Sequence, residues 1–127
     1  MKASSKPQTL RNSQQFRRVY DQGHKFHTPF FSAFMLRNDG DEQRYGITVT
    51  RKIGSAVIRN RCKRRLREVI RKYESRNSHL AYDSCLGGFD LVINVKAGLE
   101  KVDFNQLELA FSQVMDRFRN FGNKQIG

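Results

Sequence analysis

The sequence predicts an α+β domain of two layers, built in the order helix, hairpin, helix, strand, helix. Three observations lead to this fold class. Apolar residues recur at helical spacing in three segments, two strand-like segments flank a turn signal, and residues 89–96 form a predominantly apolar run. No internal repeat or linker divides the chain, so we expect residues 1–127 to form one domain.

The N-terminal part of the chain is expected to combine a flexible tail with a short helix. Residues 1–11 are polar and basic, and we expect them to lack regular structure. The stretch SQQFRRVYDQ then predicts a helix, which Asn12 or Ser13 can cap at its start and Gly23 at its end. Its apolar side chains share one face: Phe16, Val19 and Tyr20.

Three strands are predicted in the middle of the chain. PFFSAFMLRN and RYGITVTRK flank Asp39–Gly40, a pair that is typical of a hairpin turn. Phe30 and Phe31 are adjacent, so strand geometry would point them to opposite faces of the sheet, and only one is expected in the core. The run FDLVINVK at 89–96 favours a central place in the sheet.

Two further helices complete the predicted fold. Gly54–Ser55 ends the preceding strand and caps a helix that runs to about Tyr73. Asp103 and Gln106 form a plausible capping box for the last helix, and Gly122 is expected to end it. The apolar stripe of that last helix comprises Phe104, Leu107, Phe111, Val114, Phe118 and Phe121.

Positive charge is concentrated in two segments of the chain. The 24 basic and 12 acidic residues give a net charge of +12. Residues 51–76 hold eleven basic and two acidic residues, residues 1–25 hold six basic and one acidic, and the remainder is slightly acidic. A charge that served solubility alone would be spread more evenly, so we interpret these segments as a surface for a polyanion.

The helix in the basic segment has one apolar and one cationic face. At about 100° per residue, the apolar face holds Ile58, Cys62, Leu66, Val69, Ile70 and Tyr73. The opposite face and its edges hold Arg59, Asn60, Arg61, Lys63, Arg64, Arg65, Arg67, Arg71 and Lys72. Glu68 is the only acid there, whereas a solvated helix face usually mixes both signs. We therefore favour a site for a phosphate backbone, and not a membrane-surface helix, because the sheet needs the apolar face.

The order of residues within this helix indicates which kind of polyanion the protein binds. The stretch RKIGSAVIRNRCKRRLRE, residues 51–68, resembles the signature of the bacterial ribonuclease P protein component. The matching features are Arg59-Asn60-Arg61, Lys63-Arg64 and Arg67, preceded by Lys52-Ile53-Gly54 and Ala56-Val57. FRRVYDQG, YGITVTRKIG and DLVINVKAG extend the resemblance over nearly the whole chain.

The resemblance implies a specific version of the predicted fold. It implies a two-layer sandwich with a mixed sheet of about four strands and three helices, in the order α-β-β-(β)-α-β-α. It also implies a left-handed β-α-β crossover, in a fold like domain 2 of ribosomal protein S5. The hand of the crossover follows from the resemblance alone, because chain pattern would predict a right-handed connection.

The resemblance also implies a function. Proteins of this family pair with the catalytic RNase P RNA, which carries the active-site metal ions and removes the 5′ leader from precursor tRNA. The protein binds the RNA subunit and the leader, and it raises the affinity for substrate and Mg²⁺. Mg²⁺ is then the expected cofactor, bound mainly by the partner RNA, and no small-molecule substrate is expected.

The resemblance assigns two surfaces to this chain. The surface for the RNA subunit comprises Arg51, Lys52, Arg59, Asn60, Arg61, Lys63, Arg64, Arg67 and Arg71. The surface for the leader comprises Phe16, Arg17, Tyr20 and Phe34. Unpaired bases can stack on aromatic rings, which fits a single-stranded leader. From the residues alone, burial of the three aromatic rings in the core is the favoured interpretation, and only the resemblance reverses it.

Other functions are less well supported by the sequence. A structural RNA-binding protein of the ribosomal type is the alternative, and the ordered signature is what argues against it. A nuclease made of protein alone needs clustered carboxylates to hold metal ions, whereas the acids here are dispersed, so we expect no catalytic residue. The cysteines and histidines lack the spacing of a zinc site. The start of the chain lacks an apolar signal segment and no apolar run approaches a membrane span, which predicts a soluble cytoplasmic protein.

Overall fold

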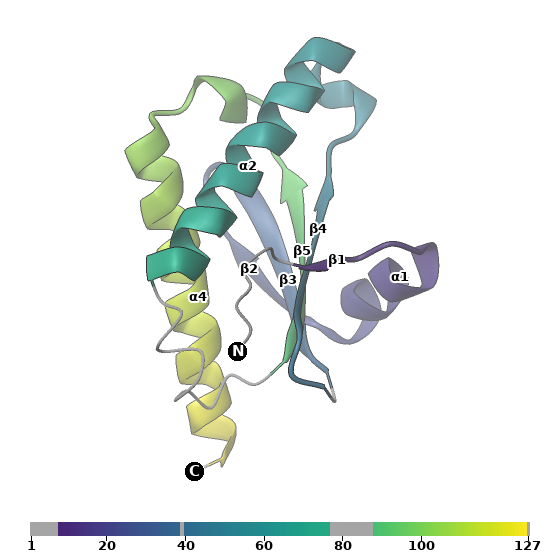
Figure 1. Ribbon diagram of the computed structural model, residues 1–127, viewed down its shortest axis with the longest axis vertical. Coiled ribbons are helices and arrows are strands. Elements are labelled where there is room, and N and C mark those ends of the chain that lie inside the picture. The colour runs from purple at the N-terminus through teal and green to yellow at the C-terminus, as the bar shows by residue number, and fades with distance from the viewer. Residues whose placement is uncertain (1–7, 39, 77–87, 127) are drawn as a thin grey trace.

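Two long helices cover one face of a mixed sheet, and a short helix lies on the other face (Figure 1). This computed structural model describes residues 8–38, 40–76 and 88–126. The strands are β1 (Gln8–Thr9), β2 (His24–His27), β3 (Phe31–Arg37), β4 (Gln43–Thr48) and β5 (Phe89–Val95). The α-helices are α1 (Ser13–Gln22), α2 (Ala56–Arg76) and α4 (Phe104–Ile126), and the 3-10 helices are η1 (Arg51–Ile53) and η2 (Leu99–Lys101). The predicted α+β class with three helices is therefore confirmed.

β5 lies between β3 and β4, which makes the predicted hairpin of these two strands wrong. The described strands form one sheet in the order β1-β4-β5-β3-β2, with β5 antiparallel to β3 and parallel to β4. All but one of the β5 residues are buried, and a central strand is the one that can be covered on both faces. The central place predicted for 89–96 is confirmed. β3 forms its hairpin with β2 instead, and Asp39 of the predicted turn lies outside the described residues.

The chain between β4 and β5 forms the β-α-β crossover expected from the resemblance. β4 ends at Thr48, earlier than predicted, and η1 then turns the chain toward α2. Ser55 caps α2 as predicted, because its Oγ accepts a hydrogen bond of 3.3 Å from the N–H of Ile58. α2 continues three residues beyond the predicted end at Tyr73 and connects two parallel neighbours of the sheet.

The two ends of the chain differ from the prediction. Gln8–Thr9 pairs with β4 although the tail was expected to lack regular structure, and the N–H of Leu10 donates to the carbonyl of Tyr45 at 2.9 Å. This pairing satisfies part of an edge of β4 that would otherwise be open. At the other end, α4 continues through Gly122, where an end was predicted. A glycine inside a helix costs only about 1 kcal/mol, which the packing of the long helix offsets.

The main core lies between the sheet and the pair α2 and α4. The predicted apolar face of α2 is confirmed, since Cys62, Leu66, Val69 and Ile70 are buried and two further members pack against them half-buried. From α4, the buried members of the predicted stripe are Leu107, Phe111, Val114 and Phe118. Of the adjacent Phe30 and Phe31, one was predicted to lie in the core, and Phe31 is fully buried there. Phe30 precedes β3, so strand alternation does not apply to it, and it packs half-buried against the same core.

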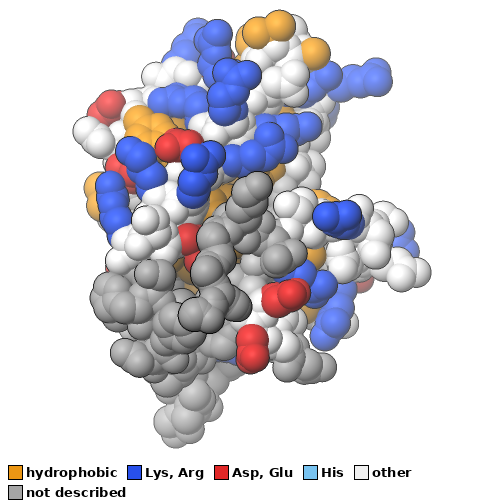
Figure 2. All heavy atoms as spheres, in the orientation of Figure 1, with side chains coloured by type: hydrophobic (Ala, Val, Ile, Leu, Met, Phe, Trp, Pro, Cys, Tyr) orange, Lys and Arg blue, Asp and Glu red, His pale blue; other side chains and the backbone are white. Residues whose placement is uncertain are grey.

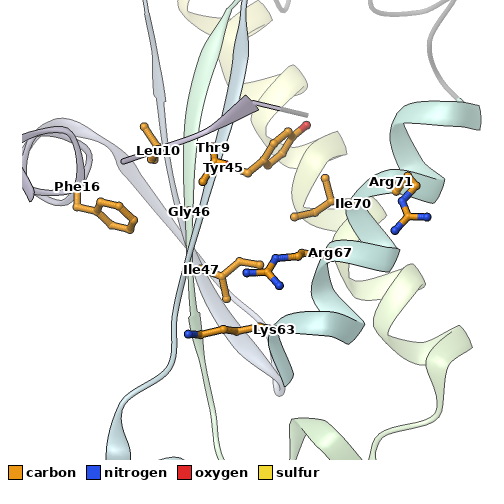
Figure 3. Close-up of a pocket in the computed structure, with 10 residues that line it drawn as sticks. All are labelled: Thr9, Leu10, Phe16, Tyr45, Gly46, Ile47, Lys63, Arg67, Ile70 and Arg71. Atoms are coloured by element: carbon orange, nitrogen blue, oxygen red, sulfur yellow. The ribbon is translucent and has the colours of Figure 1, made fainter. Parts of the chain in front are cut away.

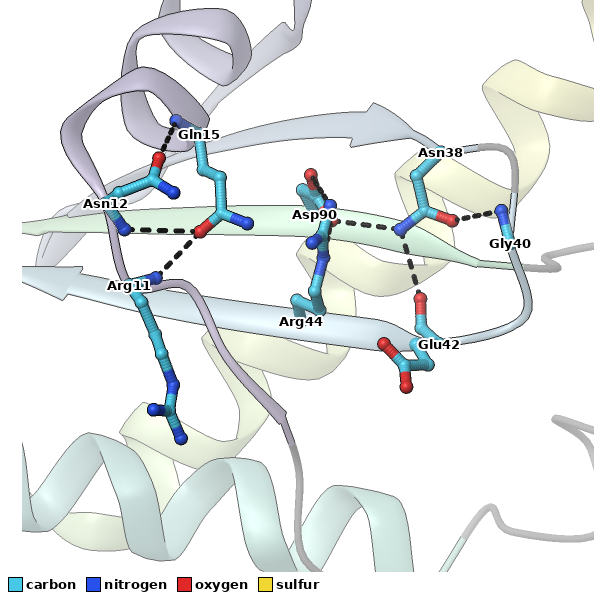
Figure 4. Close-up of polar contacts among 8 residues, drawn as sticks. All are labelled: Arg11, Asn12, Gln15, Asn38, Gly40, Glu42, Arg44 and Asp90. Carbon is cyan, nitrogen blue, oxygen red and sulfur yellow. Dashed lines mark hydrogen bonds and ion pairs between the residues drawn. The ribbon is translucent and has the colours of Figure 1, made fainter.

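A second, smaller core lies under α1. Leu10, Val19 and Val92 are buried there between the helix and the opposite face of the sheet. The predicted cap of α1 is confirmed as a capping box: the N–H of Gln15 donates to Asn12 Oδ1 at 2.9 Å, and Gln15 Oε1 accepts from the N–H of Asn12 at 3.3 Å (Figure 4). The cap fixes where the helix begins, and therefore which of its side chains face the sheet.

A buried carboxylate ties the three central strands together at one end of the sheet. Asp90 of β5 accepts hydrogen bonds from Arg44 of β4 at 2.9 and 2.8 Å and from Asn38 at 2.9 Å (Figure 4). The hydrogen bonds to Asp90 raise the pKa of the Arg44 guanidinium. Because a buried charge must be paired, this network favours one register of β4 against β5. Separately, no helix in the described part of the chain is long and apolar enough to cross a membrane.

Candidate nucleic-acid interface

The outer side of α2 and the adjoining η1 form a cationic surface, which we call the α2 face. Its members are Arg51, Lys52, Asn60, Arg61, Lys63, Arg64, Arg67 and Arg71. All are exposed except Lys63, which is half-buried. Figure 2 shows Lys and Arg side chains gathered over the upper half of the molecule, where α2 lies in front. One helix thus presents most of the predicted RNA-binding residues to solvent on a single side.

Two arginines of the same helix donate hydrogen bonds to backbone carbonyls of the protein. Arg59 Nη1 donates to the carbonyl of Gly54 at 2.8 Å, at the turn where α2 begins. Arg65 donates to the carbonyls of Leu99 at 2.9 Å and Val102 at 2.5 Å, and so ties α2 to η2. Arg59 was predicted on the RNA-binding surface, and the structure gives it an intramolecular bond that holds the turn. The sequence carried no signal for either contact, because the carbonyl acceptors are not side-chain features.

The rest of the α2 face is free to bind a polyanion. Arg71 forms an ion pair with Glu68 at 3.3 Å, and both side chains are exposed enough that solvent weakens this pair. Arg61, Arg64 and Arg67 make no hydrogen bond or ion pair with any residue that the structure describes. Guanidinium groups in this state can bind phosphate oxygens without first breaking an internal contact.

The aromatic residues predicted to bind the leader meet on the opposite face of the sheet. Phe16 and Tyr20 of α1 and Phe34 of β3 are all half-buried around the small core, and we call them the aromatic cluster. The rings of Tyr20 and Phe34 pack edge to face with centroids 4.9 Å apart. The ammonium of Lys25 lies 5.3 Å from the centre of the Phe34 ring, and Arg17 is exposed on α1. Because all three residues are half-buried, their burial does not decide between core packing and contact with the leader, and the leader site stays a prediction.

Tyr20 is held in place by its hydroxyl group. Its Oη donates to Asn94 Oδ1 at 2.8 Å and lies 3.3 Å from Thr48 Oγ1. Strand pairing aligns Thr48, Asn94, Ser32 and His27 in one row across β4, β5, β3 and β2. Sequence reasoning missed this row of polar groups beside the aromatic cluster, because it depends on the order of the strands.

Phe16 lies over a glycine of β4. A Cβ atom at Gly46 would come within 2.6 Å of the Phe16 ring, so the ring occupies the space that any other residue would need. This close approach explains why glycine stands within a strand at this position. It also fixes the Phe16 ring at the edge of the sheet that β4 and β1 form.

Two acidic side chains in or beside α2 are paired within the protein. Glu74 of α2 accepts a short hydrogen bond from the hydroxyl of Tyr45, and burial raises the pKa of the Glu74 carboxyl. Burial and the nearby Glu74 raise the pKa of Tyr45 well above its usual value. Glu108 pairs with Arg76 at 3.4 Å. Among the described residues, no group of three or more His, Cys, Asp or Glu side chains could hold a metal ion, and His79 and Cys85 lie outside those residues.

Comparison with known proteins identifies the family. The family model described as "Ribonuclease P" matches residues 5–119, which include the α2 face and the aromatic cluster. The chain belongs to the ribonuclease P protein family. A ribonuclease P protein component from Syntrophomonas wolfei is 32% identical over 110 residues, covering 85% of this chain and 84% of that protein. The resemblance read from the sequence is therefore confirmed, and the chain is a protein component of ribonuclease P.

Solved structures of ribonuclease P proteins share the fold. The RNase P protein from Thermotoga maritima superposes with a TM-score of 0.69 at 28% identity, over 87% of this chain and 96% of that one. The Staphylococcus aureus RNase P protein also gives 0.69, at 23% identity, over 90% of this chain and 97% of that one. The likeness to the second protein shows the fold alone. Together they support the two-layer arrangement that places the α2 face and the aromatic cluster on different sides of the sheet.

Proposed function

We propose that this ribonuclease P protein component binds the catalytic RNA subunit through the α2 face. The observation that carries this proposal is the division of α2 into a buried apolar side and an exposed cationic side. The buried side fixes the helix on the sheet, so the arginines project from a rigid surface. The planar fork of a guanidinium group loses less conformational entropy for each hydrogen bond it forms with phosphate, and each phosphate contact releases counterions from the RNA.

The aromatic cluster binds the 5′ leader of precursor tRNA in this proposal. The leader is single-stranded, so its bases can stack on the exposed sides of Tyr20 and Phe34. Lys25 and Arg17 lie close enough to the cluster to hold phosphates of the same strand. Mature tRNA lacks the leader, so this contact favours the precursor.

The chemistry belongs to the RNA subunit and its Mg²⁺ ions in this proposal, and the protein supplies no catalytic residue. Support comes from the carboxylates next to the cationic surface: Glu68 pairs with Arg71, and Glu108 pairs with Arg76. The cations of the α2 face reduce the repulsion between RNA subunit and substrate, which raises the affinity for substrate and lowers the Mg²⁺ concentration that the complex needs. The cytoplasm, where precursor tRNA is made, is the proposed location.

Reconstitution tests the proposal. The protein, a bacterial RNase P RNA and a precursor tRNA are combined at low Mg²⁺, with the RNA alone and the protein alone as controls. We expect cleavage with both components together, little with the RNA alone at that Mg²⁺ concentration, and none with the protein alone. Cleavage by the protein alone would overturn the assignment of the chemistry to RNA. Equal affinity of the complex for precursor and mature tRNA would favour a purely structural RNA-binding role of the ribosomal-protein type.

A further inference from the structure

A cavity of about 590 Å³ opens at the edge of the sheet between α2 and β4 (Figure 3). Lys63, Arg67 and Arg71 line it from α2, and Figure 3 shows Lys63 and Arg67 reaching from the helix toward β4. Ile70 of α2 also lines the cavity, and the other lining residues come from the sheet side and α1: Thr9, Leu10, Phe16, Tyr45, Gly46 and Ile47. The volume lies in the range of pockets that hold small ligands.

The cavity combines three kinds of group. Cations line one wall, the aromatic residues Phe16 and Tyr45 and aliphatic side chains line the others, and the edge of β4 contributes backbone. β1 pairs with β4 only as far as Thr9 opposite Tyr45, and the chain then turns away toward α1. Polar groups of alternate residues point to the same edge of a strand, so the N–H and C=O of Ile47 point toward this edge, beyond the end of β1. A nucleotide has a part that suits each kind of group. Its phosphate suits the cations, the face of its base suits the aromatic and aliphatic side chains, and the hydrogen-bonding edge of the base suits the backbone of β4.

We propose that this cavity holds one unstacked nucleotide of the precursor leader. The base lies against Phe16 and Ile47, and its phosphate lies against Lys63 and Arg67. The proposal rests on the proposed function, because it extends the leader site around the edge of the sheet. It also gives Lys63 and Arg67 a second partner besides the RNA subunit.

The position of the cavity favours the leader over the RNA subunit as the source of the nucleotide. The α2 face and the aromatic cluster lie on opposite sides of the sheet, and the cavity lies at the edge between them. Phe16 belongs to both the aromatic cluster and the cavity wall. The strand that must reach both sides is the substrate, which is cut at the RNA subunit and bound beyond the cut by the cluster. Its path around the β1 and β4 edge passes this cavity.

Filling the cavity tests the proposal without removing charge. Thr9 is exposed and lines the cavity, so Thr9→Trp places an indole where the base would lie, and Thr9→Ser is the matched control. Arg67→Ala removes a cation of the cavity wall, and Arg64→Ala removes one from the same helix outside the cavity. Circular dichroism and binding to the RNA subunit alone show whether each variant folds and assembles.

The measurement is the affinity of each reconstituted complex for precursor tRNA, for mature tRNA and for precursors with one abasic position in the leader. We expect Thr9→Trp to weaken precursor binding about tenfold, within the range for one stacked base, and to leave mature tRNA unaffected. One abasic position in the leader should lower the affinity of the wild-type complex for the precursor by the same factor. That abasic position should not lower the affinity of the Thr9→Trp complex any further. Arg67→Ala should lower the affinity for this abasic precursor less than it lowers the affinity for the intact precursor. Arg64→Ala should lower the affinity for every precursor by the same factor.

Three outcomes would overturn the proposal. A Thr9→Trp complex that discriminates precursor from mature tRNA like the wild type would leave the cavity without a leader nucleotide. A Thr9→Trp protein that binds the RNA subunit itself more weakly would assign the cavity to that RNA. If Thr9→Trp does not fold, an Arg67→Ala loss that is unaffected by every abasic position contradicts the proposal by itself. A wild-type complex that binds precursor and mature tRNA equally would instead refute the leader site as a whole.

Discussion

The α2 face and the aromatic cluster are two surfaces of one domain that arise in different ways. The α2 face is formed by a single helix and its preceding turn, and its side chains share a direction because of the helical period. The aromatic cluster draws on α1 and β3, and its polar neighbours come from β4 and β5. The first surface is local in sequence, whereas the second requires distant segments to pair in one register.

This difference determines how each surface binds RNA. The α2 face offers charge on flexible exposed side chains, which suits phosphates of any sequence. The aromatic cluster offers rings whose positions are fixed by packing and by the Tyr20 hydroxyl, which suits unpaired bases. Salt should therefore weaken binding at the first surface much more than at the second, and each surface can be tested separately.

The largest effect is expected from the α2 face. The double substitution Arg61→Ala and Arg64→Ala should weaken binding of the RNA subunit roughly 100-fold at low salt, because two phosphate contacts are lost. The slope of log affinity against log salt should fall by about two. Titration of the RNA subunit at several salt concentrations measures both quantities.

The matched control removes two exposed cations elsewhere, at Lys101 and Arg117. The Lys101→Ala and Arg117→Ala protein has the same net charge as the test variant. It should keep nearly the wild-type affinity and slope. Equal losses in both double variants would mean that net charge, and not the α2 face, attracts the RNA.

The sequence predicted the α2 face almost completely. The period of apolar residues places Cys62, Leu66 and Val69 inside, and the opposite side follows by geometry. What the sequence missed are Arg59 and Arg65, whose guanidinium groups bind backbone carbonyls. A helical wheel assigns a direction to each side chain, but it contains no information on the chain that packs beside the helix.

The sheet side was predicted less well, for a physical reason. The Asp39–Gly40 signal favoured direct pairing of β3 with β4, but the need to bury β5 on both faces is stronger and places that strand between them. The polar row that includes Asn94 and Thr48 exists only in this order of strands. The aromatic residues were named from the family resemblance, since burial alone would have placed them all in the core.

The second prediction tests the aromatic cluster. Tyr20→Ala and Phe34→Ala should each weaken precursor binding by about 1–3 kcal/mol through lost stacking, and should barely affect mature tRNA. Equilibrium binding of both ligands by the reconstituted complex checks this. Tyr20→Phe keeps the ring and removes the bond to Asn94, so it should retain most of the affinity. Equal losses on precursor and mature tRNA would contradict a leader site.

The smallest effect is expected from Arg65, which ties α2 to the η2 segment. Arg65→Ala removes the hydrogen bonds to the carbonyls of Leu99 and Val102, so it should lower the free energy of unfolding by about 1–2 kcal/mol. Because Arg65 is engaged internally, the salt slope of RNA binding should not change. Arg64→Ala should leave the free energy of unfolding nearly unchanged and reduce the salt slope, because its side chain bonds to no residue that the structure describes. Urea unfolding and RNA titration of the two variants measure both quantities. Equal changes of the salt slope in both variants would mean that Arg65 contacts the RNA as Arg64 does, in spite of its internal hydrogen bonds.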